Sequence, residues 1–387
     1  MKIISVVAAR PNFMKIAPFI RAVEQYNQEN NNSIEHILVH TGQHYDIRMS
    51  EAFFTELNIP RPDINLEIGS GSHAEQSGHA MIAFEKVLVE HKPDCVVLVG
   101  DVNATLACSI SAKKLNIKVC HIEAGLRSGD MSMPEEINRL VTDRISDLLL
   151  TPDRLSSVNL LKEGIAEDKI KFVGNIMIDT LEANKEKASK FKIEEIIAAN
   201  LFHEFILNQT IPDDNNYALL TLHRPSNVDN VKVFSKLIDF LTDEVTRDLT
   251  LIWPLHPRAE NRLKKFGIWD KVVNNRALIL LEPLAYQEML RLNMGARVVL
   301  TDSGGLQEEC CVLGTPCLTL RWNTERPVTL REHGGASVLV GNNIEKIREE
   351  YRKTLQLSRT PTRPELWDGH TAQRCLTEIV KMINKPG

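Results

Sequence analysis

The sequence predicts an α/β protein with two parallel-sheet domains, and three observations support this fold class. The chain has 387 residues, which suits two domains of under about 200 residues each better than one ordinary core. Short apolar runs of strand length alternate with segments whose apolar residues recur at helical spacing. This alternation is interrupted once, between about residues 180 and 212, and then restarts.

The first half contains six apolar runs of strand length, namely IISVV, HILVH, CVVLVG, KVCHIE, DLLLT and IKFVG. The segments between them, such as PNFMKIAPFIRAVEQY and HAMIAFEKVLVEH, have helical spacing. Strands that are buried on both faces and joined by helices form parallel sheets with right-handed crossovers. We therefore expect a Rossmann-like domain over residues 1–180.

A linker and a second sheet follow. The segment 181–212 is charged and largely helical, and it leads into the turn-rich IPDDNN. Six further apolar runs then occur, namely YALLTL, LTLIWPL, ALILLEPL, ARVVLTD, PCLTLR and SVLVG. They predict a second Rossmann-like domain over residues 213–365.

Composition and charge exclude several classes of protein. The formal net charge is −5 and no polybasic tract occurs, so a nucleic-acid partner is not expected. The first apolar run is too short for a signal peptide, and no run approaches the ~20 apolar residues of a membrane span. The seven cysteines form no Cys-x-x-Cys pair. An odd number of cysteines in apolar contexts predicts reduced, buried thiols in a cytoplasmic protein.

Motifs for metals and common cofactors are missing from the sequence. There is no Walker A sequence and no D-x-D pair, and the histidines of HILVH lack a third ligand. The only match to G-x-G-x-x-A is GSGSHA at Gly69 to Ala74, which is too late in the domain for a dinucleotide site and is expected to be a flexible loop. We expect neither a metal nor a cofactor.

Polar residues follow nearly every predicted strand. In open parallel sheets, ligands bind outside the carboxyl ends of the strands. One such residue alone is an ordinary loop residue, but their recurrence in both halves predicts a shared cleft. They include Arg10, Gln43, His44, Asp101, Glu123, Asn175, His223, His256 and Asp302.

Three carboxylates are candidates for proton transfer. Asp101 and Glu123 end two predicted strands, and Glu135 follows a proline that suits the first position of a helix. Asn138 and Arg139 would then share a helix face with Glu135. Carboxylates that lie close together raise one another's pKa and become proton carriers. The alternative for Glu135 is a favourable charge near the helix N-terminus.

The segment DSGGLQEE has the features of an anion site. Gly304 and Gly305 would expose backbone N–H groups at the start of a helix, directly after Ser303, where the helix dipole favours phosphate. Glu309 lies about one turn further on and could accept hydrogen bonds from two ribose hydroxyls. The alternative is a plain glycine-rich turn between a strand and a helix.

Three basic residues could add positive charge to such a site. Arg10 precedes a proline at a predicted helix start, Lys15 follows about one turn later, and Arg326 lies in the segment NTERP. The alternatives are an ordinary helix N-terminus with a surface lysine and a salt bridge within a loop.

Eight motifs occur in the order and spacing of a known family. They are ARPNFMKIAP, GDVNATLA, HIEAGLRSGD, MPEEINR, VGNIMID, LHR, TDSGGLQEE and NTERPVT. Together they resemble the non-hydrolysing UDP-N-acetylglucosamine 2-epimerases over residues 3–341. The resemblance implies a GT-B fold, with two parallel sheets facing across a cleft and a C-terminal helix at 366–387 that packs back on the first domain. It also implies a cytoplasmic homodimer that needs no added cofactor.

The resemblance implies a reaction and a role for each candidate residue. Such enzymes interconvert UDP-GlcNAc and UDP-ManNAc, which supplies ManNAc units for cell-surface polysaccharide. UDP leaves C1 while a base removes the C2 proton, and UDP adds back to the resulting 2-acetamidoglucal. Proton transfer falls to the carboxylates Asp101, Glu123 and Glu135. His223 is implied as a further catalytic residue, which holds the diphosphate together with Arg10 and Lys15. The second domain would bind the diphosphate through Ser303, Gly304 and Gly305 and the ribose through Glu309. The other residues implied to bind the substrate are Asn138, Arg139, His256 and Arg326.

Three rival functions stay open on the sequence. A hydrolysing epimerase would release ManNAc and UDP, a related 2-epimerase would act on another UDP-sugar, and a UDP-sugar sensor would have no use for three clustered carboxylates.

One motif departs from the family pattern. Members that are regulated by their own substrate carry Gln-His followed by a second Gln, whereas Gln43-His44 is followed here by Tyr45 and Asp46. The resemblance therefore does not extend to activation by the substrate.

Overall fold

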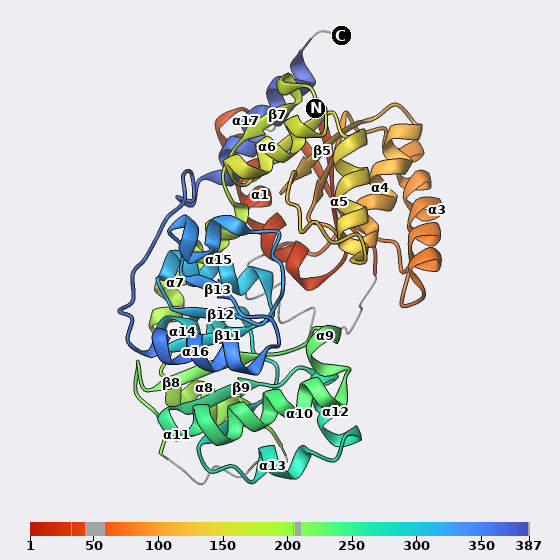
Figure 1. Cartoon of the computed structure of the whole chain (residues 1–387). Coiled ribbons are helices and arrows are strands. Elements are labelled where there is room, and N and C mark those ends of the chain that lie inside the picture. The colour runs from red at the N-terminus through yellow and green to blue at the C-terminus, as the bar shows by residue number, and fades with distance from the viewer. Residues whose placement is uncertain (32, 43–58, 204, 206–209, 386–387) are drawn as a thin grey trace. The chain divides into compact units, whose positions relative to one another are not determined.

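The computed structural model describes residues 1–31, 33–42, 59–203, 205 and 210–385. It divides into two units, and Figure 1 shows the elements of both. Unit 1 comprises Met1–Ala183 with Pro364–Gly387, and unit 2 comprises Asn184–Arg363. Each unit has one parallel sheet with helices around it, which confirms the predicted fold class.

The sheet of unit 1 has seven strands in the order β3-β2-β1-β4-β5-β6-β7, and all its pairs are parallel. Every apolar run predicted in this half forms a strand. The inner strands β1, β4, β5 and β6 are almost entirely buried, whereas the residues of the edge strand β7 are half-buried. The two-residue strand β3 is too short to leave such a run and was not predicted. The strands are β1 (Lys2–Val7), β2 (Glu35–His40), β3 (Ile64–Asn65), β4 (Cys95–Val99), β5 (Lys118–Ile122), β6 (Leu148–Thr151) and β7 (Ile170–Phe172).

The helices of unit 1 connect these strands. In Figure 1, α3, α4 and α5 lie side by side, and α1 packs beside α17. The helices are α1 (Arg10–Glu29), α3 (His73–His91), α4 (Asn103–Lys114), α5 (Pro134–Ile145), α6 (Arg154–Lys162), η1 (Glu167–Lys169), α7 (Ile176–Ser189) and α17 (Thr371–Asn384). Helix α7 crosses the division of the chain, because its residues from Asn184 on belong to unit 2.

The segment GSGSHA is a loop only in its first part. Ser72 is the N-cap of α3, and it forms a capping box with Glu75. The segment therefore ends as the ordered start of a helix, because a serine three residues before a glutamate satisfies backbone N–H groups at the helix start. The prediction of a flexible loop missed this cap.

The end of the chain belongs to unit 1. Asp179 accepts hydrogen bonds from the backbone N–H groups of Thr371 (3.1 Å) and Ala372 (2.7 Å), which begin α17. The indole of Trp367 donates to the carbonyl of Pro152 at 3.0 Å, and its side chain is buried. The C-terminal segment is therefore part of the core of this unit.

The sheet of unit 2 has six parallel strands in the order β10-β9-β8-β11-β12-β13. All six runs predicted in this half form its strands. They are β8 (Tyr217–Thr221), β9 (Thr250–Pro254), β10 (Leu278–Leu281), β11 (Val298–Thr301), β12 (Cys317–Thr319) and β13 (Ser337–Leu339).

The helices of unit 2 cover a core that includes Trp253 and Phe234, both fully buried. Among the described residues no helix of the chain is long and apolar enough to cross a membrane. The helices are α8 (Ile193–Asn200), α9 (Pro225–Val228), α10 (Val231–Phe240), η2 (Leu241–Val245), α11 (Thr246–Asp248), α12 (Pro257–Lys265), α13 (Trp269–Val273), α14 (Tyr286–Gly295), α15 (Gly304–Leu313), η3 (Pro327–Thr329), η4 (Arg331–His333) and α16 (Ile344–Leu355).

Each sheet has one point at which the strand order reverses. In unit 1 this point lies between β1 and β4, and in unit 2 it lies between β8 and β11. Loops that follow these strands diverge and leave room for a ligand. The candidate residues Asp101 and His223 follow directly after such strands.

Candidate active site

Glu123 has the most unusual backbone of the candidate residues in unit 1. It follows β5 with φ +73°, in the left-handed region that few side-chain-bearing residues adopt. Its N–H donates to the carbonyl of Leu150 at 3.0 Å, and the residue is 4% exposed. Its carboxylate forms an ion pair with the ammonium of Lys15 on α1. A strained, buried carboxylate at the end of a strand is typical of a functional position.

Asp101 lies one residue after Gly100, whose backbone adjoins the same ion pair. A Cβ at Gly100 would be 3.4 Å from Lys15 Nζ and 3.6 Å from Glu123 Oε2. The structure therefore brings together the segment of Asp101 with Glu123 and Lys15. Sequence analysis assigned Lys15 to a phosphate, but here its ammonium contacts Glu123.

Helix α5 supplies two of the predicted residues to this cluster. Arg139 is buried and forms an ion pair with the carboxylate of Asp101. Asn138 donates to the backbone carbonyl of Asp101 at 2.8 Å and to Asn103 Oδ1 at 3.3 Å. These contacts fix both the backbone and the side chain of Asp101.

The two neighbouring glutamates of α5 differ sharply. Glu136 is buried and accepts hydrogen bonds from the backbone N–H groups of Ser128 and Gly129 and from Arg139. Burial alone would raise the pKa of Glu136, but these donors hold it below its ordinary value. Glu135 is half-buried and forms no hydrogen bond or ion pair with any residue that the structure describes. Among the carboxylates of Asp101, Glu123, Glu135 and Glu136, only that of Glu135 has no hydrogen bond or ion pair with a described residue.

In unit 2, His223 is oriented by Asp302. The side chain of Asp302 is fully buried, and its Oδ1 lies 2.7 Å from His223 Nδ1. The same carboxylate accepts the backbone N–H groups of His223 (3.0 Å) and Arg224 (2.9 Å). Burial would raise the pKa of Asp302, but His223 and these N–H groups hold it below its ordinary value. The side chain of His223 is partly exposed, so this contact orients a ring that solvent can reach.

His256 lies beside His223, with ring centroids 5.5 Å apart. It follows β9 as the N-cap of α12, and its Nδ1 accepts the backbone N–H of Arg258 at 3.1 Å. This hydrogen bond assigns Nδ1 as an acceptor, so a proton on the neutral ring would be at Nε2. The structure therefore brings these two predicted histidines together.

The segment DSGGLQEE forms the predicted turn from strand to helix. Ser303 is the N-cap of α15, but its side chain makes no capping hydrogen bond. A Cβ at Gly304 would lie 2.8 Å from Arg326 Nη1, whereas one at Gly305 would meet nothing within 4 Å. The start of this helix therefore has a guanidinium on one side and open space on the other, which suits an anion.

Arg326 is held by carboxylates rather than by solvent. Its guanidinium pairs with Glu325, and its Nε lies 2.7 Å from Glu308 Oε1. All three side chains are buried, and Arg321 pairs with Glu325 at 2.6 Å. The alternative for Arg326, a salt bridge within a loop, is therefore present as its pair with Glu325. This pair neutralises part of the positive charge that a phosphate would need.

Glu309 is a buried residue of helix α15. Burial raises the pKa of Glu309 to about 7, although hydrogen bonds with Tyr286 and Asn293 act in the opposite direction. Sequence analysis assigned this residue to ribose, and that role stays a prediction.

Some predicted features lie outside the described residues. The structure describes the backbone of Arg10, which begins α1, but not its side chain. Gln43, His44, Tyr45 and Asp46 fall in the segment 43–58, which is outside the described residues. The described part of the chain has no group of three or more potential metal ligands.

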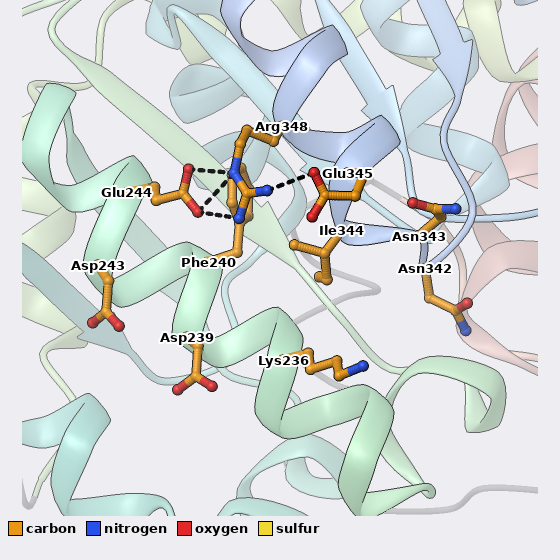
Figure 2. A pocket seen from close by; sticks show the side chains of 10 residues that line it. All are labelled: Lys236, Asp239, Phe240, Asp243, Glu244, Asn342, Asn343, Ile344, Glu345 and Arg348. Atoms are coloured by element: carbon orange, nitrogen blue, oxygen red, sulfur yellow. Dashed lines mark hydrogen bonds and ion pairs between the residues drawn. The ribbon is translucent and has the colours of Figure 1, made fainter.

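A hollow of about 550 Å³ also lies on unit 2, between α10, η2 and α16 (Figure 2). Figure 2 shows Arg348 paired with Glu244 and Glu345. Outside the lining residues, Lys271 pairs with Asp239 and Asp243. Each of these two cations thus has two carboxylate partners, so the hollow has no surplus of positive charge for a phosphate, and none of the predicted site residues lines it. We assign it no ligand.

Two buried polar contacts are not predictable from the motifs alone, those of Asp302 with His223 and of His121 with Asp143. The sequence indicates Asp302 only as a polar residue after a strand. A signal existed for the second pair: Glu136, Arg139 and Asp143 occur at i, i+3 and i+7 of α5, where an inward face is normally apolar.

Comparisons with known proteins agree with the predicted family. The family model for UDP-N-acetylglucosamine 2-epimerase matches residues 27–380. A UDP-N-acetylglucosamine 2-epimerase of Methanocaldococcus jannaschii is 45% identical over 348 residues, which are 90% of each chain. A UDP-2,3-diacetamido-2,3-dideoxy-D-glucuronate 2-epimerase of Pseudomonas aeruginosa is 36% identical over 92% of each chain. The crystal structure of the M. jannaschii UDP-GlcNAc 2-epimerase with UDP-GlcNAc and UDP superimposes with a TM-score of 0.87 and 42% identity, covering 98% of this chain and 100% of that one.

Proposed function

The chain belongs to the UDP-N-acetylglucosamine 2-epimerase family, and we propose that it interconverts UDP-GlcNAc and UDP-ManNAc without releasing the free sugar. The observation that carries this proposal is the strained, buried Glu123 beside the segment of Asp101. A protein that only binds a UDP-sugar gains nothing from such a carboxylate, because it needs no proton transfer.

The chemistry requires proton carriers and a stabilised leaving group. The C2–H of a hexosamine is not acidic, so the bond from C1 to the UDP oxygen must break as a base takes the C2 proton. The electron pair of the C–H bond forms the C1=C2 bond of 2-acetamidoglucal, and UDP departs with the electrons of the C1–O bond. Delivery of a proton to the other face of C2, with return of UDP to C1, gives the epimer.

We propose Glu123, Asp101 and Glu135 as the groups that move these protons. Glu123 and Asp101 are fixed by Lys15 and Arg139, respectively, so each is held in one orientation. Glu135 has no hydrogen bond or ion pair to break with any described residue, and it would approach the sugar from α5. Epimerisation at C2 needs one group that removes the proton from one face of the ring and another that delivers a proton to the opposite face.

We propose that unit 2 binds the nucleotide. The start of α15 offers N–H groups to the diphosphate, and His223, oriented by Asp302, adds a donor there. These groups stabilise the charge that grows on UDP as the C1–O bond breaks. Arg10 and His256 complete the proposed diphosphate contacts, and Glu309 is the proposed ribose contact.

We propose that the protein works in the cytoplasm, where it supplies ManNAc units for cell-surface polysaccharide. Its seven cysteines are all free and buried, as is typical of a reducing compartment. These free thiols therefore support the proposed cytoplasmic location.

We also propose that the protein is a homodimer. Large apolar side chains are exposed on the helical layer of unit 1: Ile82 (62%) and Val89 (56%) on α3, and Ile137 (43%) on α5. Such residues favour burial against a second copy. Light scattering should give twice the chain mass of 43.7 kDa, and Ile82→Lys with Val89→Lys should give a monomer. A monomeric wild type would contradict the proposal.

The direct test of the activity is incubation with UDP-GlcNAc, followed by proton NMR. We expect UDP-ManNAc to appear until the two sugars reach equilibrium. Free ManNAc with UDP would instead show a hydrolysing epimerase. No reaction with UDP-GlcNAc, together with turnover of UDP-2,3-diacetamido-2,3-dideoxy-D-glucuronate, would show a 2-epimerase of another UDP-sugar. UDP binding without any turnover would show a sensor.

A further inference from the structure

A fully buried histidine, His121, is close in sequence to the proposed proton carrier Glu123. His121 is on β5, two residues before Glu123, and its ring bridges two elements. Its Nε2 is 2.8 Å from the carbonyl oxygen of Gly100, and its Nδ1 is 2.6 Å from Asp143 Oδ1 on α5. The reaction scheme above uses neither His121 nor Asp143.

The partners of His121 fix the orientation of its ring. A carbonyl oxygen can only accept, so Nε2 donates to Gly100. Asp143 is held in turn, because its other oxygen accepts the N–H of Gly125 (3.0 Å) and Arg127 Nη1 (2.8 Å). Burial would raise the pKa of Asp143, but His121 and Arg127 hold it below its ordinary value. The ring of His121 therefore bridges the carbonyl of Gly100 and the carboxyl group of Asp143.

This buried pair fixes the backbone on both sides of the proposed carboxylates. His121 holds the carbonyl of Gly100, which has φ +72° and lies one residue before Asp101. Asp143 holds the N–H of Gly125, which has φ +81° and lies two residues after Glu123. Glycine adopts many backbone conformations at little cost, so these hydrogen bonds help to select the observed one in each turn.

We propose that His121, held in place by Asp143, is a positioning residue that sets the geometry of Asp101 and Glu123 for proton transfer at C2. This inference rests on the proposed function, because it assigns those carboxylates to the reaction. Neither side chain contacts the substrate in this account. Both act through the loops that carry the carboxylates.

Kinetics of two variants test the positioning role. Asp143→Asn and His121→Gln should each lower kcat about 10- to 100-fold, the usual effect of losing a supporting hydrogen bond. The KM for UDP-GlcNAc should stay within about twofold, since the nucleotide contacts are untouched. His36→Gln is the matched control, because His36 is on β2 of the same sheet and bonds to Ser5 Oγ at 2.9 Å. It should keep the wild-type kcat even if it lowers the melting temperature.

NMR of wild-type protein labelled with ¹⁵N-histidine tests the ring contact without any variant. The Nε2 of His121 should carry a directly bonded, slowly exchanging proton, because the ring is buried and Nε2 donates to the carbonyl of Gly100. An Nε2 without a proton would overturn this contact. Wild-type kcat in both variants, or an equal loss in His36→Gln, would overturn the positioning role. If the wild type does not epimerise UDP-GlcNAc at all, the proposed function fails, and the NMR result still decides whether His121 holds the carbonyl of Gly100.

Discussion

At the scale of the residue, Glu123 has the central role in the proposed reaction, and its backbone conformation costs stability. A left-handed conformation at a non-glycine residue costs on the order of 1–2 kcal/mol, and packing alone gives no reason to keep it. Glu123→Gln preserves the shape of the side chain but cannot accept a proton. It should lower kcat by about 10² to 10⁴ and leave UDP affinity nearly unchanged, as measured by turnover assays and calorimetry.

A second glutamate with positive φ provides the control. Glu67 in the same unit has φ +52° and is exposed, so Glu67→Gln should keep full turnover. If Glu123→Gln turns over at the wild-type rate, Glu123 is not a proton carrier. If it loses UDP affinity and turnover in equal measure, its role is in binding.

Glu309 gives a pH-dependent prediction at the same scale. Its pKa is about 7 when folded against 4.5 ordinarily, so the folded chain holds a proton that the unfolded chain releases between these values. The penalty on stability is absent below about pH 4.5, grows as the pH rises, and is complete above about pH 7. Glu309→Gln should therefore melt at a higher temperature than the wild type at pH 8, and this difference should shrink at pH 5.

Calorimetry at the two pH values checks this. Glu308→Gln is the matched control, because Glu308 pairs with the buried Arg326, and its loss should lower the melting temperature at pH 8. A stabilisation by Glu309→Gln that is equal at both pH values would contradict the shifted pKa.

At the scale of the element, the start of α15 makes a prediction from two adjacent glycines. Gly304→Ala places a methyl group 2.8 Å from the guanidinium of Arg326, so it should lower the melting temperature. Gly305→Ala meets nothing within 4 Å, so it should leave the melting temperature unchanged. It should nevertheless weaken UDP binding, because its methyl group enters the space proposed for the diphosphate. Unchanged UDP affinity in Gly305→Ala would move the anion site elsewhere.

The elements also show what the sequence could predict. The strands were predictable because continuous apolar runs leave few alternatives, and the glycines after Ser303 marked the helix start. Local spacing could not tell Glu135 from Glu136, since both follow the same proline. Packing distinguishes the two glutamates, because only the carboxylate of Glu136 accepts hydrogen bonds from the backbone N–H groups of Ser128 and Gly129. The contact of His121 with Asp143 joins a strand to a helix, so it required the tertiary structure.

At the scale of the whole molecule, unit 1 is discontinuous, and this makes a prediction about its end. Removal of residues 364–387 leaves every candidate site residue in the chain. It also exposes the groups that α17 covers and leaves the buried Asp179 without the N–H groups of Thr371 and Ala372. The truncated chain should lose activity and show a weaker or absent unfolding transition for unit 1. Full activity after truncation would contradict the assignment of this segment to the core.

The most direct test of the account is epimerisation in deuterated water, followed by proton NMR. If UDP leaves as a base removes the C2 proton, the returning proton comes from solvent-exchanged carboxyl groups. The account therefore predicts that UDP-ManNAc forms with deuterium at C2, and that Glu123→Gln forms it at least about 10²-fold more slowly. UDP-ManNAc that keeps the original C2 hydrogen would contradict proton transfer by these carboxylates.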